Sequence, residues 1–263
     1  MSFGNDHTSI IRGAELAKIS DRLRGAGLVV EIGGGNGFQS RLLSDLVRNV
    51  ISLDVSRHPD PMAPVTIYDG YNIPLADGAA DHIFTSNVLE HIVDLDRSLE
   101  EMRRVLADTG SAIHILPTPG WRIWTTLTHY IGLPRILWGN LNNLRAINAA
   151  ASPRRPVESG RSEVSAPGRR VFFKWKWIGS ILLSQRHGER GNRITEAFYF
   201  RKNWWQKKFL STGWQVVESF PTGLFYSGNI VFGKLMPIEL RRKLAAILGS
   251  STRVFIVRKV NSG

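Results

Sequence analysis

The stretch Val29-Val30-Glu31-Ile32-Gly33-Gly34-Gly35-Asn36-Gly37 decides the fold of this chain. Its apolar start is typical of a buried strand, and four glycines then fall within five residues. Glycine lacks a Cβ and tolerates positive φ, so it lets the backbone turn sharply beneath a ligand and touch it. Apolar residues at helical spacing follow over 38–47. The stretch therefore predicts a strand, a nucleotide-binding turn and a helix.

The spacing of the glycines indicates which kind of nucleotide binds. Dinucleotide-binding turns follow G-x-G-x-x-G, whereas Gly33, Gly35 and Gly37 are more closely spaced. A carboxylate at Glu31 would repel a pyrophosphate but would pair with the ammonium of an amino acid. We therefore expect a cationic nucleoside; the alternative is a plain tight turn.

The composition excludes several classes of chemistry. The chain has 263 residues, enough for one α/β domain with insertions, and no cysteine. The lack of cysteine excludes disulfides, thiolate metal sites and cysteine nucleophiles, including the covalent route to 5-methylpyrimidines. Residues 1–7 are polar and unlike a signal peptide, and no apolar run is long enough to span a bilayer. We expect a cytoplasmic protein, soluble or peripheral at the inner face of the membrane.

The net charge of +12 is divided unevenly along the chain. Residues 1–117 carry 10 Lys and Arg against 16 Asp and Glu, whereas residues 118–263 carry 24 against 6. The acidic half suits a cationic cofactor, and the basic half suits an anionic substrate, an acidic phospholipid surface or nucleic acid. Solvated charge that keeps the protein soluble is the alternative.

Further elements are predicted on both sides of the glycine turn. Periodicity and turn residues predict helices over 9–25, 38–47 and 94–106, and strands over 28–32, 49–54, 65–68, within 73–87, and over 111–116. Asp54 ends the second strand about 20 residues after the glycines, where nucleoside-binding folds place a carboxylate on the ribose hydroxyls.

Several blocks of this sequence resemble the class I S-adenosylmethionine-dependent methyltransferases, in their type 11-like form. They are EIGGGNG (31–37), IPLADGAADHIF (73–84), SNVLEHI (86–92) and EEMRRVLADTGSAIHIL (100–116). The resemblance implies S-adenosyl-L-methionine as cofactor and S-adenosyl-L-homocysteine as product. It also implies an α/β fold with a Rossmann-like, doubly wound sheet of seven strands in the order 3-2-1-4-5-7-6, the last strand antiparallel, and an inserted substrate cap.

The same resemblance implies a set of cofactor-binding residues. They are Glu31, Gly33 and Gly35 for the amino-acid part, Asp54 for the ribose, Asp69 for the adenine amino group, Asn87 in the pocket wall, and Gly37, Val55 and Gly70 beside them. The alternatives are that Asp69 only begins a turn and that Asn87 caps a helix.

Two positions depart from related patterns. Ala80 stands where the family usually has an aromatic residue, and this removes no polar contact. Ser86-Asn87-Val88-Leu89 stands where enzymes that act on the exocyclic amines of bases have an asparagine-proline-proline-aromatic run. Base-amine methylation by that route is therefore not expected.

The family pattern stops at residue 118. We expect a cofactor-binding core over 1–117, a basic and aromatic substrate cap over 118–200, and completion of the sheet over 201–263 with a basic helical insertion near 221–251. Within these regions we expect short helices over 121–141, a mobile loop near 152–170, strands over 213–220 and 252–259, and a basic helix over 236–249.

Aromatic residues alternate with cations over 171–178 and 201–210. This pattern suits a membrane interface with acidic lipids. In the second segment, Trp204, Trp205 and Phe209 share one helical face, so a helix packed on the core is the alternative.

Methyl transfer from a sulfonium to a hydroxyl requires alignment of the acceptor and removal of its proton. His91 follows the fourth strand and is the candidate catalytic residue, as a base or as an acceptor-orienting group. The alternative for His91 is a helix-start residue bonded to the backbone, and His187, beside Glu189, is the second candidate. No carboxylates have the spacing of a magnesium site, so no metal is expected.

The sequence thus predicts an S-adenosylmethionine-dependent O-methyltransferase. Its acceptor is expected to be an anionic small molecule, a glycan or a lipid-linked compound, with an acidic membrane surface as a further partner. An RNA methyltransferase is the alternative enzyme, because the same charge and the Trp/Lys pattern suit RNA. A non-catalytic binding protein that keeps the cofactor fold is the alternative of another class.

Overall fold

The computed structural model describes residues 7–131, 186–228 and 236–260. The chain divides into two compact units, one formed by residues 1–124 and 186–263 and the other by residues 125–185. The sheet and the site described below belong to the first unit. The loop expected near 152–170 and the aromatic stretch 171–178 lie outside the described residues.

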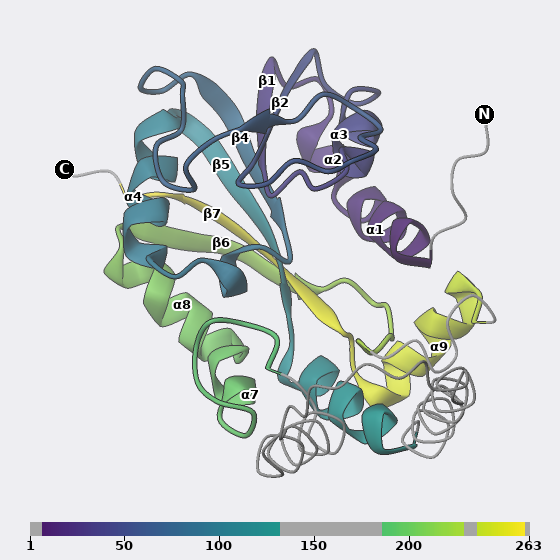
Figure 1. Cartoon of the computed structure of the whole chain (residues 1–263). Coiled ribbons are helices and arrows are strands. Elements are labelled where there is room, and N and C mark those ends of the chain that lie inside the picture. The colour runs from purple at the N-terminus through teal and green to yellow at the C-terminus, as the bar shows by residue number, and fades with distance from the viewer. Residues whose placement is uncertain (1–6, 132–185, 229–235, 261–263) are drawn as a thin grey trace, which may run out of the picture. The chain divides into compact units, whose positions relative to one another are not determined.

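Seven strands form one sheet in the order β3-β2-β1-β4-β5-β7-β6 (Figure 1). The first five strands pair in parallel, and β7 runs antiparallel to both β5 and β6. The strands are β1 (Leu28–Ile32), β2 (Asn49–Asp54), β3 (Thr66–Ile67), β4 (Ala80–Ser86), β5 (Leu106–Pro117), β6 (Trp214–Pro221) and β7 (Thr252–Lys259). The predicted fold class and strand order are confirmed.

Helices cover both faces of this sheet (Figure 1). The helical segments named in the described residues are α1 (His7–Ala17), α2 (Ser20–Leu23), α3 (Phe38–Leu43), the 3-10 turn η1 (Leu89–His91), α4 (Leu95–Val105), α7 (Glu196–Tyr199), α8 (Lys202–Ser211) and α9 (Ile238–Leu248). Residues 119–131 are also helical, which confirms the start of the helical region expected over 121–141. In the part of the chain that is described, no helix has both the length and the apolar character needed to cross a membrane.

The core has two layers, one on each face of the sheet. Val29 of β1 packs with buried residues of α1, α2 and α3, whereas its neighbour Val30 packs with those of α4 and α8. Successive side chains of a strand point to opposite faces, so a central strand covered on both sides is apolar at successive positions. The apolar start of the glycine stretch thus reflects the central position of β1.

The second aromatic and cationic segment is a core helix. In α8, Trp205 and Phe209 are buried against the sheet, and Trp204 packs at the margin of the same cluster. Phe209 also contacts Phe255 of β7, with the ring centroids 5.7 Å apart. The alternative expected for this segment, a helix packed on the core, is confirmed.

Three predicted boundaries are wrong. The helix expected over 38–47 ends at Leu43. The helix expected over 9–25 is interrupted after Ala17, where the Ser20 hydroxyl donates to the Ala17 carbonyl and a new short helix begins. The strand expected over 111–116 begins at Leu106, because Leu106 pairs with Ala80 before a bulge shifts the register. Residues 107–110, which lie between the helix expected over 94–106 and the strand expected over 111–116, are accommodated within this strand.

Candidate functional site

The glycine turn joins β1 to α3 and lies at the carboxyl ends of the parallel strands. Gly33 has φ of +80°, and its N–H donates to the Leu53 carbonyl at 2.8 Å. A Cβ at Gly33 would lie 2.2 Å from a Val88 methyl carbon. Both the positive φ and this close approach require glycine, so the turn passes directly against the segment after β4.

Glu31 lies beneath this turn. Its side chain is buried and accepts hydrogen bonds from the hydroxyls of Ser40 and Ser52, the latter at 2.7 Å. Burial raises the pKa of Glu31, and these two hydroxyls oppose the shift. The carboxylate holds β1, β2 and α3 together below the turn.

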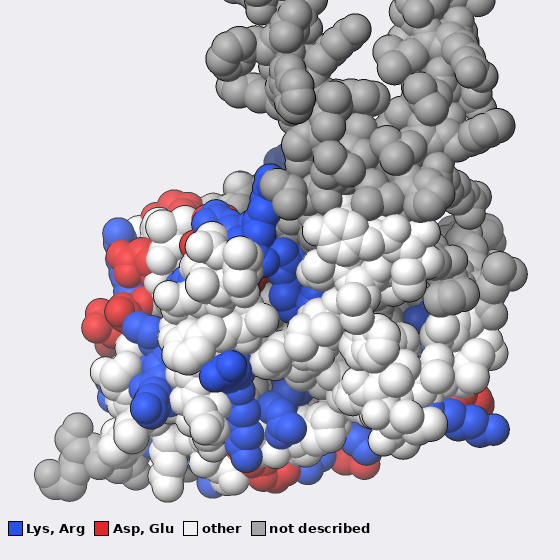
Figure 2. All heavy atoms as spheres, turned by 90° about the horizontal axis from the view of Figure 1, so that it is seen from below, with Lys and Arg blue, Asp and Glu red and all other residues white. Residues whose placement is uncertain are grey.

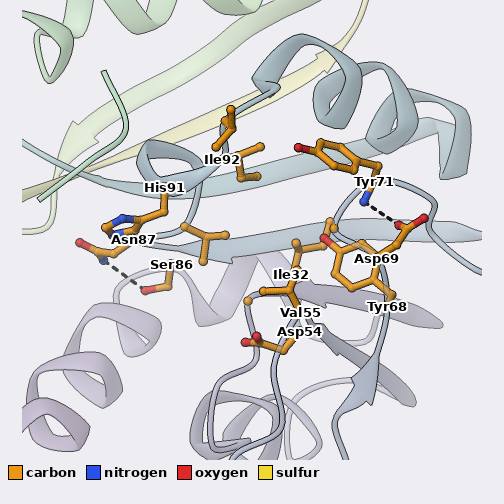
Figure 3. A pocket seen from close by; sticks show the side chains of 14 residues that line it. Ile32, Asp54, Val55, Tyr68, Asp69, Tyr71, Ser86, Asn87, His91 and Ile92 are labelled. Carbon is orange, nitrogen blue, oxygen red and sulfur yellow. Dashed lines mark hydrogen bonds between the residues drawn. The ribbon is translucent and has the colours of Figure 1, made fainter. Parts of the chain in front are cut away.

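A cavity of about 420 Å³ opens beside the turn (Figure 3). Its lining comes from the ends of β1, β2 and β4 and from the segments that follow β2, β3 and β4. The lining residues are Ile32, Gly33, Asp54, Val55, Tyr68, Asp69, Gly70, Tyr71, Ser86, Asn87, Val88, His91, Ile92 and Val93. Figure 3 shows Asn87 and His91 at one end of the cavity and Asp69 and Tyr71 at the other.

Asp54 ties the glycine turn to the end of β2. Its carboxylate accepts from the Gly35 N–H at 2.8 Å and from the Ser56 N–H at 3.0 Å. A carboxylate has about four acceptor positions, so this geometry leaves capacity for the hydroxyls of a ligand. Asp54 is also part of the cavity lining.

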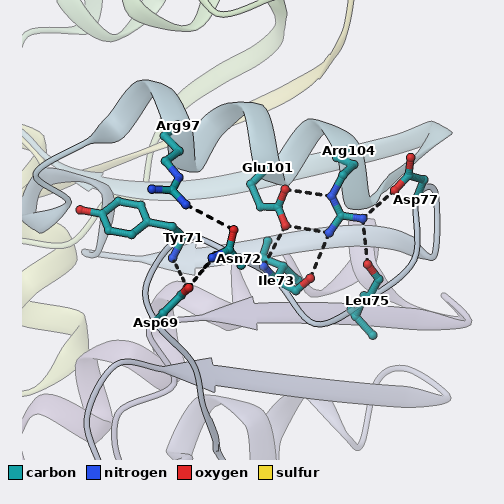
Figure 4. Close-up of polar contacts among 9 residues, drawn as sticks. All are labelled: Asp69, Tyr71, Asn72, Ile73, Leu75, Asp77, Arg97, Glu101 and Arg104. Atoms are coloured by element: carbon teal, nitrogen blue, oxygen red, sulfur yellow. Dashed lines mark hydrogen bonds and ion pairs between the residues drawn. The ribbon is translucent and has the colours of Figure 1, made fainter.

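Asp69 organises the loop after β3 (Figure 4). Its carboxylate accepts from the N–H groups of Asn72 and Tyr71, at 2.7 and 2.8 Å, and from the Asn72 side chain. These hydrogen bonds lower the pKa of Asp69, and the one from the Asn72 N–H contributes most. Arg97 of α4 lies over the Tyr71 ring at 4.7 Å and so fixes that side of the cavity.

Asn87 connects the cavity to α1. It has φ of +55°, and its N–H donates to the Ile115 carbonyl at 2.8 Å. In the amide orientation that its neighbours require, the Asn87 side-chain oxygen accepts from the Arg12 guanidinium. Arg12 is itself paired with the buried Glu15 at 2.7 Å, so α1 is fastened to the wall of the cavity.

Beyond Asn87, three titratable side chains meet. The Glu90 side chain is 2% exposed, and Glu90 Oε1 lies 3.9 Å from His91 Nε2 and 3.7 Å from His187 Nε2. The two imidazole rings are 4.6 Å apart in an edge contact, and the Trp121 ring covers His187 at 4.5 Å. Burial lowers the pKa of His91, and the Glu90 carboxylate opposes the shift.

The segment 186–190 that carries His187 is docked on η1. Glu189 N–H donates to the Glu90 carbonyl at 2.8 Å, and the Arg190 guanidinium donates to the Ile92 carbonyl at 2.6 Å. On the other side, the His187 N–H donates to the buried Glu196, which pairs with Arg122 at 2.7 Å. This segment lies far from η1 in the sequence but forms part of the same site.

The structure brings together most of the residues that the sequence singled out. Those in the cavity lining are Gly33, Asp54, Val55, Asp69, Gly70, Asn87 and His91; Glu31, Gly35 and Gly37 support the turn without lining the cavity. The sequence missed Arg12, Glu90, Tyr68 and Tyr71. Only Glu90 carried a signal, as an acid beside His91 in the SNVLEHI block.

The cavity fits the nucleoside that the resemblance implies. Ile32, Val55 and Tyr68 provide apolar surface between the carboxylates of Asp54 and Asp69. Burial and the charge of Asp54 raise the pKa of Tyr68 to about 12, so its phenol stays neutral at physiological pH. The apolar walls match the flat base of a nucleoside. Of the two carboxylates, one can accept from the amine of the base and the other from the hydroxyls of the sugar.

Residues 30–114 match the family model described as "Methyltransferase domain". The chain is 28% identical over 186 residues to the biotin biosynthesis bifunctional protein BioHC of Cellvibrio japonicus, across 65% of this chain and 37% of that protein. It is 30% identical over 123 residues to an uncharacterized methyltransferase of Mycobacterium sp. (strain KMS), across 41% of this chain and 47% of the relative. The chain spans less than half the length of these relatives.

Solved structures share the fold over nearly the whole chain. A 1,6-didemethyltoxoflavin-N1-methyltransferase of Burkholderia thailandensis, solved with 1,6-didemethyltoxoflavin and S-adenosylhomocysteine, has a TM-score of 0.52 at 12% identity and covers 99% of this chain and 82% of its own. An S-adenosylmethionine-dependent methyltransferase of Mesorhizobium loti has a TM-score of 0.50 at 14% identity, across 95% of this chain and all of its own. At such identities the likeness shows the fold alone.

Proposed function

We propose that this chain, whose residues 30–114 match a methyltransferase domain, is a class I S-adenosylmethionine-dependent methyltransferase that transfers a methyl group to a hydroxyl of an anionic acceptor. The acceptor class we propose is a small molecule, a glycan or a lipid-linked compound. The observation that supports this proposal is the placement of His91 and Asn87 together at one end of a cavity whose other end carries Asp69.

Each cavity residue takes a role in holding the cofactor. We assign the ribose hydroxyls to Asp54, the adenine amino group to Asp69, and the amino-acid part to the backbone at Gly33, where a Cβ has no room. Because Glu31 is buried beneath the turn, it acts as the support of the turn. S-adenosylmethionine supplies an activated methyl group on a positively charged sulfur.

We place the acceptor at the His91 end of the cavity, where it would meet that methyl group. Methyl transfer is an in-line displacement, so the site gains most of its rate from holding the acceptor oxygen on the line of attack. A hydroxyl acceptor must also lose its proton as it attacks. We assign the orientation of the acceptor, or the removal of its proton, to the His91 end of the cavity.

The charge of the molecule supports an anionic acceptor. In the face shown in Figure 2, Lys and Arg side chains are spread over the described surface, and Asp and Glu side chains gather toward its edges. Such a surface attracts anions over distances of about 10 Å at ordinary salt. An acidic membrane surface is the further partner that we propose on the same ground.

The cofactor assignment is tested by calorimetry with S-adenosylmethionine and S-adenosylhomocysteine. We expect the wild type to bind both, and Asp54→Asn to weaken binding about tenfold, because a charge-assisted hydrogen bond of about 1.5 kcal/mol is lost. Asp60→Asn, in the exposed loop after β2, is the matched control and should bind as the wild type. Absence of binding by the wild type would favour a non-catalytic protein that keeps this fold.

The acceptor is identified with a labelled methyl donor. The protein is incubated with the labelled cofactor and fractions of a cell extract, and the label is followed into small molecules, lipid-linked glycans and RNA. Label in RNA would overturn the proposed acceptor class. Vesicles with and without acidic lipids, at rising salt, test the membrane partner, because binding that is indifferent to lipid charge contradicts it.

A further inference from the structure

Glu90 is a buried carboxylate that accepts no hydrogen bond from the described residues. It is 2% exposed, and neither of its side-chain oxygens has a hydrogen-bond partner in the part of the chain that the structure describes. An unpaired carboxylate in such a place costs several kcal/mol, so a native site compensates it. What neutralises Glu90 is therefore a question about the function of this site.

The neighbouring arginines are engaged with other groups. The Arg12 side chain pairs with Glu15, Arg122 with Glu196, and Arg186 with Glu189. A fourth, Arg190, donates to the backbone carbonyls of Leu89 and Ile92. Among the described residues, the two histidines are the groups within ion-pair distance of the Glu90 carboxylate, and Arg12 and Arg190 interact with its charge from farther away.

The separations within this cluster fit a bridging metal ion. The distances of 3.7 and 3.9 Å from Glu90 Oε1 to the two Nε2 atoms are too long for direct hydrogen bonds. A bridging water with two hydrogen bonds of about 2.8 Å would hold its partners about 4.6 Å apart. Two bonds of about 2.1 Å to a metal ion, at tetrahedral or wider angles, hold the two ligand atoms about 3.4 to 4.0 Å apart, as observed here.

We propose that Glu90, His91 and His187 bind one divalent transition-metal ion, of which zinc is the best match. One ligand atom from each residue lies within 4.8 Å of the other two, and the partly exposed imidazoles need only small rotations to close the remaining distance. Two imidazoles and one carboxylate are the ligand set of catalytic zinc sites, which keep a fourth position open. Nitrogen ligands of this kind disfavour magnesium and calcium.

The ligands are held in advance of metal binding. The segment 186–190 is pinned to η1 through the Glu90 carbonyl, and Trp121 packs on the His187 ring. A Cβ on Gly188 would lie 2.9 Å from the Glu90 carbonyl oxygen, so the two segments are in contact. The expectation of no metal rested on carboxylate spacing along the sequence, whereas this cluster joins two distant segments.

The metal site adds a way to activate the acceptor of the proposed function. This role rests on the proposed function, because it requires the acceptor to be a hydroxyl. His91 belongs both to the cavity lining and to the cluster, so an acceptor hydroxyl can occupy the open position. A metal ion there would lower the pKa of the hydroxyl, so that its proton would leave to bulk water and the oxygen would form the new bond to the methyl carbon as the carbon–sulfur bond breaks. Metal binding itself is measured without methyl transfer.

The experiment is a titration of the metal-free, tag-free full chain with Co²⁺, followed by visible absorption. We expect one equivalent to bind with the ligand-field bands of a low-coordinate site, and a large excess of Mg²⁺ to leave them unchanged. The variants Glu90→Gln and His187→Ala should each weaken binding by more than about tenfold. His58→Ala, which removes an exposed histidine outside the cluster, is the control and should bind as the wild type.

Two outcomes would overturn the proposal: a wild type that binds no Co²⁺, or binding that both cluster variants retain at full strength. Calorimetry with S-adenosylhomocysteine reports whether each variant keeps its cavity. If Glu90→Gln fails to fold, His187→Ala still tests the metal site, because the His187 side chain is 34% exposed. The two proposals can fail separately. A protein that binds Co²⁺ but no cofactor contradicts the proposed function alone, and the reverse contradicts the metal site alone.

Discussion

At the scale of single residues, the glycine turn is defined by contact with Val88. Gly33→Ala places a Cβ against the Val88 methyl groups and forces alanine into positive φ. We expect a loss of about 2 to 4 kcal/mol in the free energy of unfolding, from about 1 to 2 kcal/mol of backbone strain and a similar cost of overpacking. Cofactor binding, measured by calorimetry, should fall with it.

A double variant separates these two causes. In Gly33→Ala with Val88→Ala the steric clash is relieved but the backbone strain remains, so stability should recover in part. Full recovery would show that the positive φ costs nothing, and no recovery would show that Val88 is not the obstacle. Urea unfolding of the two single variants and the double variant gives the coupling energy.

Residues whose position in the cavity depends on local backbone were predictable from the sequence. Gly33 and Asp54 follow from a turn and from the end of a strand, which are both readable within a few positions. Glu90 and His187 were not predictable as a pair, because their meeting depends on how segment 186–190 docks on η1. Likewise, nothing in the sequence pointed from Arg12 to Asn87.

At the scale of elements, the docking of segment 186–190 on η1 is the feature on which the histidine cluster depends. Gly188→Ala should push this segment away from the Glu90 carbonyl, since the added methyl group has about 2.9 Å where it needs more than 3.4 Å. We expect Co²⁺ affinity to fall several-fold and hydrogen exchange at Glu189 N–H to speed up, with cofactor binding retained. Unchanged exchange at Glu189 would contradict this account of the docking.

In the helix α1, a methyl group can be added to a glycine without a clash. Gly13 lies in its interior, and a Cβ there would meet Leu42 and Phe38 at 3.8 Å, an ordinary packing distance. Gly13→Ala should therefore stabilise the protein by about 0.5 to 1 kcal/mol in urea unfolding, through helix propensity. Because this variant adds the same methyl group without a clash, it is the matched control for Gly188→Ala.

At the scale of the whole molecule, the sheet was predictable because its strands are marked one by one. Apolar runs end at Glu31, Asp54 and Asn87, and the known order of the resembling family then arranges them. The interruption between α1 and α2 was not predictable, because helical periodicity continues across it. The bulge within β5 was not predictable, because residues 107–110 have the composition of a turn. They depend on packing against the sheet and on pairing with β4.

The acid stability of the whole fold should depend on His114, at the centre of the sheet. Its side chain is fully buried in β5, bonded through Nδ1 to the Thr85 hydroxyl at 2.9 Å and stacked on Phe209 of α8. Burial lowers the pKa of His114 from 6.5 to about 3. Between these two values the unfolded chain binds a proton at this residue and the folded chain does not.

Stability therefore falls as pH drops below about 6.5, by up to about 1.4 kcal/mol per pH unit from this residue alone. His114→Gln keeps a hydrogen-bonding group for Thr85 but does not titrate, so it should lower neutral stability and flatten the decline between pH 6.5 and 4. Urea unfolding of both proteins at several pH values gives the slope of the free energy of unfolding against pH for each. The contributions of groups that both proteins share, such as Glu31, cancel in the difference between the two slopes. Equal slopes would mean that His114 is protonated within the folded sheet, which its burial between β4, β7 and α8 opposes.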